Sequence, residues 1–151
     1  MDQFKSVDDI LDFAIEREQE STDFYNQLAG QVEKPWMKDL FRGFSQEEMK
    51  HKAKLQSVKS GQTLLPSKQK VLDLKIADYL VDVEASPGMN FQEALMVAMK
   101  KEKAAFKLYT DLAKSTNNND LQSSFQALAQ EEAKHKLHFE VLYDDLILSD
   151  N

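Results

Sequence analysis

The chain has 151 residues, of which 42% are hydrophobic, and it contains only 4 glycines, 3 prolines and no cysteine. A formal net charge of −7 argues against a surface for nucleic acid or anionic membranes, and the absence of cysteine excludes disulfides, thiolate catalysis and cysteine-held metals. No apolar run approaches the ~20 residues of a membrane span and no signal-peptide pattern opens the chain, so we expect a single cytoplasmic, all-α domain over residues 1–151.

Breaker residues divide the chain into four long helices. Gly30 stands where a first helix would end and Pro35 where the next could begin. Later in the chain, Asp120 follows a run of asparagines and is a candidate helix cap. The predicted helices cover residues 6–30, 35–59, 90–115 and 120–147, and they form two hairpins, 6–59 and 90–147.

Residues 60–89 form a connector between the two predicted hairpins. Within it, the stretch VLDLKIADYLVDV at 71–83 is predicted to form a short helix between two loop-like segments. About 30 residues is too long for a tight turn, and such a length suits a crossover that runs along a four-helix bundle.

The second hairpin repeats the sequence of the first. QEEMKHK at 46–52 returns as QEEAKHK at 130–136, and the agreement continues without a gap. The matching residues are Ala14, Glu18, Tyr25, Leu28, Ala29, Phe41, Gln46, Glu47, Glu48, Lys50, His51 and Lys52 in the first half, and Ala98, Glu102, Tyr109, Leu112, Ala113, Phe125, Gln130, Glu131, Glu132, Lys134, His135 and Lys136 in the second. This pattern indicates an internal duplication of a helical hairpin.

Apolar residues at alternating steps of four and three mark one inward face on each predicted helix, and each face is apolar except near its centre. A three-residue step leaves two side chains about 60° apart around the helix and ~4.5 Å apart along it, so a Glu-x-x-His pair reaches one point. Folding each hairpin brings the polar centres to the same level. The sequence therefore predicts one buried layer, made of Glu18, Glu48, His51, Glu102, Glu132 and His135.

Four buried carboxylates need positive charge beside them. Each buried ion costs several kcal/mol, and the total could exceed the ~5–15 kcal/mol stability of a domain. The four inward faces carry no lysine or arginine, whereas two divalent cations would balance four carboxylates. Coordination by several oxygens and one nitrogen per ion favours iron or manganese.

Other polar residues lie close to this layer. Tyr25 and Tyr109 are two turns beyond the first glutamate of their own hairpin, where a phenol could hydrogen-bond to a ligating carboxylate and tune the metal. Glu47 and Glu131 fall off the inward faces one turn before the histidines, and we expect them to be solvated or to contact the ligands from outside. His138 has no counterpart in the first hairpin and is predicted to be a surface residue.

Together these residues resemble the rubrerythrin, or erythrin, branch of the ferritin-like di-iron carboxylate superfamily, over residues 5–147. The resemblance implies a ferritin-like four-helix bundle with two irons bridged by carboxylates, and it leaves open which glutamates bridge. Manganese or zinc can occupy the same ligands in a purified sample. Many rubrerythrins also carry an additional glutamate one turn after the third-helix ligand. That position is Ala105 here, mirrored by Ser21, and the small side chains leave room for a bound oxygen species.

The resemblance implies an oxidoreductase that reduces hydrogen peroxide, or dioxygen, at a di-iron site. Full-length rubrerythrins receive electrons from a cysteine-ligated rubredoxin iron, which a chain without cysteine lacks, so the donor is expected to be a separate rubredoxin- or ferredoxin-like protein. The alternatives are a ferroxidase or iron-storage protein, and a structural bundle that retains the ligands. A homodimer is expected, and the long connector would permit an exchange of hairpins.

Overall fold

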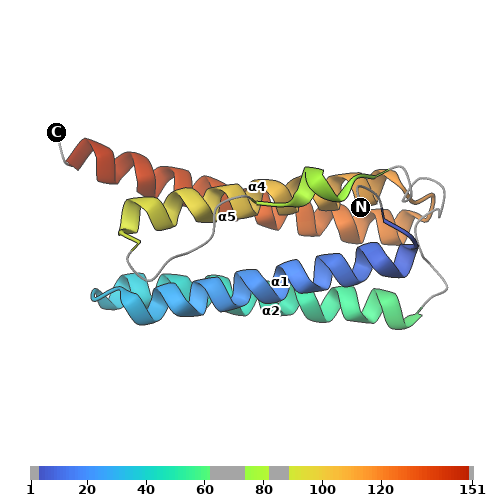
Figure 1. Cartoon of the computed structure of the whole chain (residues 1–151), viewed down its shortest axis with the longest axis horizontal. Helices are drawn as coiled ribbons and strands as arrows, with labels where there is room; N and C mark the ends of the chain where they lie inside the picture. Colours follow the sequence, from blue (N-terminus) through green and yellow to red (C-terminus); the bar gives the residue numbers. More distant parts are fainter. Residues whose placement is uncertain (1–3, 62–73, 82–88, 150–151) are drawn as a thin grey trace.

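The computed structural model describes residues 4–61, 74–81 and 89–149, and four long helices dominate them. They pack as two antiparallel hairpins, α1 with α2 and α4 with α5, which lie side by side (Figure 1). The elements are α1 (Val7–Gln31), α2 (Pro35–Gly61), the short 3-10 helix η1 (Ile76–Tyr79), α4 (Phe91–Lys114) and α5 (Asn119–Ser149). Within the described residues this all-α bundle of two hairpins confirms the predicted fold class, and none of the described helices has the length and apolar character that a bilayer crossing requires.

Two helix ends differ from the prediction. The structure starts α5 at Asn119, where Asn118 Oδ1 accepts a hydrogen bond from the Leu121 N–H at 2.9 Å, so Asn118 is the cap. Asp120 instead lies in the first turn, where its negative charge faces the positive end of the helix dipole. Similarly, α1 continues through Gly30 and ends at Gln31, because the next residue takes an extended conformation.

Two apolar clusters flank the middle of the bundle. One contains Leu11, Leu55 and Phe125, and the other contains Phe41 and Phe139, all of them fully buried. The clusters lie on opposite sides of the predicted glutamate and histidine layer along each helix. Burial of such side chains contributes about 1.5–3 kcal/mol each, so the two clusters fix the helices on both sides of that polar layer.

The described part of the connector contains a turn that is anchored to α4. In η1 the buried Tyr79 donates a hydrogen bond from its hydroxyl to Asp111 Oδ2 at 2.7 Å, and its ring contacts Phe4 and Phe13. Figure 1 shows η1 lying along α4. The helix predicted over 71–83 is thus confined to a single 3-10 turn within the described residues, and the ends of the predicted range lie outside them.

Candidate metal centre

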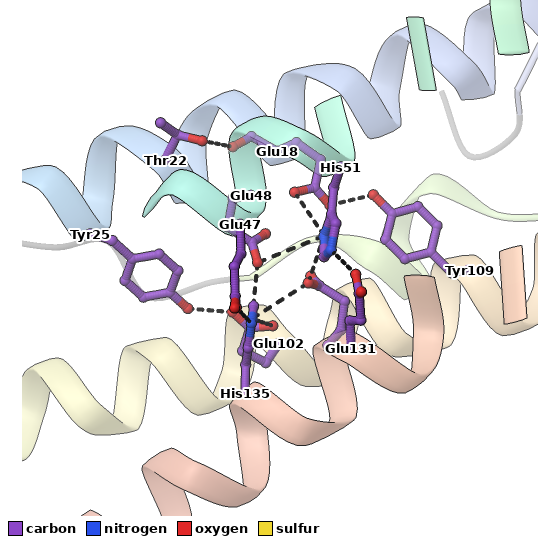
Figure 2. A network of polar contacts seen from close by, with 11 residues as sticks. Glu18, Thr22, Tyr25, Glu47, Glu48, His51, Glu102, Tyr109, Glu131 and His135 are labelled. Carbon is purple, nitrogen blue, oxygen red and sulfur yellow. Dashed lines mark hydrogen bonds and ion pairs between the residues drawn. The ribbon is translucent and has the colours of Figure 1, made fainter. Parts of the chain in front are cut away.

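All four long helices contribute to one buried polar cluster at the middle of the bundle. Each member is at most 5% exposed, and Figure 2 shows the labelled members converging. Glu18 comes from α1, Glu48 and His51 from α2, Glu102 from α4, and Glu132 and His135 from α5. The structure therefore brings together the six residues that the sequence placed in one layer, and we call them the glutamate–histidine cluster.

Ligand atoms in the cluster form two overlapping groups. The first group is Glu18, Glu48, His51 and Glu132, and the second is Glu48, Glu102, Glu132 and His135. Within each group the ligand atoms lie within 4.8 Å of one another. Glu48 and Glu132 belong to both groups, and we call them the shared glutamates. Such an arrangement can hold two cations side by side with two carboxylates between them.

Each histidine faces the cluster with its Nδ1 atom. His51 Nδ1 lies 3.0 Å from Glu132 Oε1, and His135 Nδ1 lies 3.0 Å from Glu48 Oε1, so each Nδ1 atom is nearest the shared glutamate of the other hairpin. Two further contacts are longer: His51 Nδ1 lies 3.7 Å from Glu18 Oε2, and His135 Nδ1 lies 3.6 Å from Glu102 Oε2. The two rings are nearly parallel, with 14° between their planes.

Among the residues that the structure describes, several buried atoms of the cluster make no hydrogen bond of acceptable geometry. They are Glu18 Oε2, Glu48 Oε1 and Oε2, His51 Nδ1, Glu102 Oε2, Glu132 Oε1 and His135 Nδ1. An unsatisfied buried polar atom costs about 1–3 kcal/mol, and more when it is charged, so the folded chain would not retain this set without compensation. Carboxylate oxygens and imidazole nitrogens that converge on common points are suitable ligands for iron or manganese, so the donor set fits the expected pair of metal ions.

Two buried tyrosines hold the outer glutamates of the cluster across the bundle. Tyr25 in α1 donates a hydrogen bond to Glu102 Oε1, and Tyr109 in α4 donates one to Glu18 Oε1. Figure 2 shows the two phenols approaching from opposite sides. Each tyrosine thus contacts the glutamate of the other hairpin. Burial, followed by the nearby carboxylates, raises the pKa of both phenols well above its ordinary value, so both remain protonated donors.

Glu47 and Glu131 contact the far side of the histidine rings. Nε2 of His51 lies 2.5 Å from Glu131 Oε2, and Nε2 of His135 contacts Glu47 Oε2 in the same way. Because a carboxylate accepts, the proton of each ring is held at Nε2 and Nδ1 is left available as a ligand. Their side chains are 52% and 56% exposed, so these glutamates are both solvated and in contact with the predicted ligands. The recurrence of the first glutamate of QEE in both hairpins was the sequence signal for this role.

Charges within the cluster favour protonation when no cation is present. Burial, and then the charges of neighbouring carboxylates, raises the pKa of Glu48 and Glu132 well above 4.5. Burial lowers the pKa of His135, but the carboxylates of Glu102 and Glu48 outweigh burial and raise it to about 10. The pKa of His51 is raised by Glu18 and Glu131 against the same opposing effect of burial. A bound cation would take the place of these protons.

Cavities approach the cluster from two sides. On the α1–α4 side a cavity of about 470 Å³ is lined by Glu18 and Tyr109, together with the small residues Ser21 and Ala105 noted in the sequence. On the α2–α5 side a cavity of about 500 Å³ is lined by both histidines of the cluster and by Glu47 and Glu131. His138 also lines this second cavity; it is exposed, as predicted, and its ring packs edge-on against Phe44.

Comparison with known proteins agrees with this geometry. A protein-family model described as rubrerythrin matches residues 9–79 and 93–151. A search among curated proteins found no match.

Two solved structures share the fold. A Thermotoga maritima protein, described as a ferritin-like diiron-carboxylate protein, is 21% identical with a TM-score of 0.79, over 94% of this chain and 97% of that one. A hypothetical protein from Pyrococcus furiosus is 22% identical with a TM-score of 0.75, over 95% of this chain and 91% of that one. Because the family model spans most of the residues, including every member of the glutamate–histidine cluster, the chain belongs to the rubrerythrin family.

Proposed function

We propose that this protein is a di-iron oxidoreductase that reduces hydrogen peroxide. The observation that supports it is the pair of overlapping ligand groups that have Glu48 and Glu132 in common. In this proposal Glu48 and Glu132 would be ligands common to both irons, Glu18 and Glu102 would each hold one iron, and each histidine would hold one through Nδ1. When bound, the iron pair supplies Lewis acidity and the two electrons that cleave an O–O bond.

The residues around the ligands have separate tasks in this proposal. Tyr25 and Tyr109 hold the outer glutamates in place by hydrogen bonds across the bundle. Glu47 and Glu131 hold the Nε2 proton of each histidine, which keeps Nδ1 directed into the cluster. The apolar clusters on both sides keep bulk water from the carboxylates, which strengthens their interaction with cations.

Turnover requires electrons from outside the chain. Because the sequence has no cysteine, it cannot hold a cysteine-ligated iron as an internal electron source. We therefore propose a separate rubredoxin- or ferredoxin-like protein as the donor, and a homodimer as the working assembly.

Single-turnover oxidation tests the proposed activity. The protein is loaded with ferrous iron under anaerobic conditions, and the optical spectrum is followed after mixing with either hydrogen peroxide or air-saturated buffer. We expect fast oxidation by peroxide and slow oxidation by air, with two electrons consumed per two irons. Faster oxidation by air, together with the uptake of many irons per chain, would contradict this proposal and favour a ferroxidase or iron-storage function.

A further inference from the structure

Apolar side chains are exposed in a row along the C-terminal half of α5. Leu137, Val141 and Leu148 are 61%, 50% and 72% exposed. Together with Lys134 and Asp144 they follow one another at alternating steps of three and four residues, so they share one side of the helix. That side is about 180° around the helix from the inward face that carries the cluster ligands. We call these five residues the outer row of α5.

The first hairpin shows that the fold does not require these apolar side chains. In the internal repeat, Leu137 and Val141 correspond to Ala53 and Ser57 of α2, which are exposed as well. The two helices share their ligands and their inward pattern, yet α5 has large apolar side chains in solvent where α2 has small ones. Exposed apolar patches of this kind are typical of surfaces that another protein covers.

The outer row continues into a part of α5 that has few neighbours. Within the described residues α5 packs mainly against α4. It is the longest described helix, with 31 residues against 24 in α4, and Figure 1 shows its C-terminal end extending past the start of α4. Leu148 belongs to this end. A second helix laid along the outer row would therefore cover apolar side chains that the bundle itself leaves in solvent.

The two charged residues of the outer row have opposite signs and are available for pairing. Lys134 and Asp144 are exposed, and neither forms an ion pair with another described residue. They lie five residues before and five residues after Phe139, and Leu137 and Val141 lie two residues before and after it. When the row is reversed about this residue, lysine meets aspartate and leucine meets valine. The outer row is therefore complementary to itself in an antiparallel arrangement.

We propose that the outer row of α5 packs against the same row of a second copy of this chain, with the two helices antiparallel across a twofold axis level with Phe139. Leu137 then packs against the partner's Val141, and Lys134 pairs with the partner's Asp144, each contact occurring twice by symmetry. Sliding the helices by one heptad would instead place Val141 against the partner's Asp144, which leaves a carboxylate without a cation. This inference rests on the homodimer proposed above and locates its interface.

The mass of the iron-loaded protein in solution tests the interface directly. Sedimentation equilibrium should give twice the mass of the chain. Leu137→Ala combined with Val141→Ser gives α5 the side chains that α2 has at the equivalent positions, and it should raise the dissociation constant of the dimer about 10- to 100-fold. The control is Met49→Ala, which removes an apolar side chain of α2 that is 46% exposed and should leave the dissociation constant unchanged.

Exchanging the two charges tests the antiparallel register. Lys134→Asp and Asp144→Lys should each weaken the dimer about fivefold, because like charges then face each other at both ends of the contact. The two substitutions change the net charge in opposite directions, so a general charge effect would not weaken both. The variant that combines them restores opposite charges and should recover the wild-type dissociation constant. Each variant should still bind two irons, which shows that the cluster is intact.

The outcomes separate this inference from the proposed activity. A monomeric wild-type protein overturns the inference and leaves the outer row to a different partner, such as the electron donor. A dimer that persists when Leu137 and Val141 are both replaced has its interface elsewhere and also overturns it. Failure of the combined charge variant to recover the dimer contradicts the antiparallel pairing. None of these results changes the reaction with hydrogen peroxide, which the single-turnover experiment tests separately.

Discussion

Each histidine of the cluster has glutamate oxygens near both of its ring nitrogens. Nδ1 of His51 faces Glu132, and Nε2 faces Glu131 on the same helix of the opposite hairpin. His135 is arranged in the same way with Glu48 and Glu47. Consecutive glutamates of QEE therefore act on the two edges of one imidazole, which accounts at the residue scale for the paired glutamates of the repeat.

Removing the outer contacts should weaken metal binding. For Glu47→Ala combined with Glu131→Ala, we expect the affinity for ferrous iron to fall about 10- to 100-fold, because the imidazoles lose the carboxylates that fix their proton and orientation. The corresponding double glutamine variant keeps an acceptor and should recover part of the loss. Competition with a chelator measures the affinity, and Glu33→Ala, an exposed position, is the control. Equal affinity for all variants would contradict the role given to Glu47 and Glu131.

Replacing a shared glutamate should have opposite effects on the metal-free and loaded protein. Burial and the neighbouring carboxylates raise the pKa of Glu48, so at pH 8 the unfolded chain, which ionises this group, is favoured; Glu48→Gln removes that penalty, and the metal-free protein should melt about 3–6 °C higher. Loss of a proposed ligand common to both irons should reduce bound iron to below two per chain. Calorimetry and metal analysis measure both effects. A lower melting temperature of the metal-free variant would show that Glu48 is stabilising without metal.

At the scale of the elements, the sequence was sufficient to predict the four long helices and their inward faces. Apolar spacing determines which side of a helix is buried, and the six polar residues predicted at the centres of these faces are each at most 5% exposed. The crossed contacts from Tyr25 to Glu102 and from Tyr109 to Glu18 were not predictable. They depend on the offset between the two hairpins, which periodicity within a single helix does not report.

The N-terminal cap of α5 could also not be identified from the sequence alone, and the observed cap gives a prediction. Asparagine and aspartate are both good caps, so spacing alone did not distinguish Asn118 from Asp120. Asn118→Ala should destabilise the protein by about 1 kcal/mol through loss of the hydrogen bond from the Leu121 N–H, and Asp120→Asn by only a few tenths. Urea unfolding of both variants measures the difference. A larger loss for Asp120→Asn would contradict the observed cap.

Over the whole molecule, the protonation of the cluster should make metal-free and metal-loaded stability respond oppositely to pH. Above about pH 4.5 the unfolded chain ionises its glutamates while the folded chain keeps protons on Glu48 and Glu132, whose pKa is raised, so stability falls as the pH rises. His135 contributes stability that is complete below pH 6.5 and is lost as the pH passes through its folded pKa of about 10. The glutamates and His135 therefore both make the metal-free protein less stable as the pH rises.

Melting temperatures measured from pH 5 to pH 10 test this expectation. The metal-free protein, kept in chelator, should become less stable throughout this range. The loaded protein should become more stable from pH 5 to about pH 8, because metal binding requires deprotonated ligands. Parallel curves for the two forms would show that the cluster does not exchange protons for cations.

Anomalous X-ray diffraction at the iron absorption edge, on crystals of the ferrous-loaded protein, tests the central claim most directly. Two peaks are predicted, one beside Nδ1 of His51 and one beside Nδ1 of His135, each within bonding distance of Glu48 and Glu132. A single peak, or iron bound outside the glutamate–histidine cluster, would contradict the assignment of a di-iron centre to these residues.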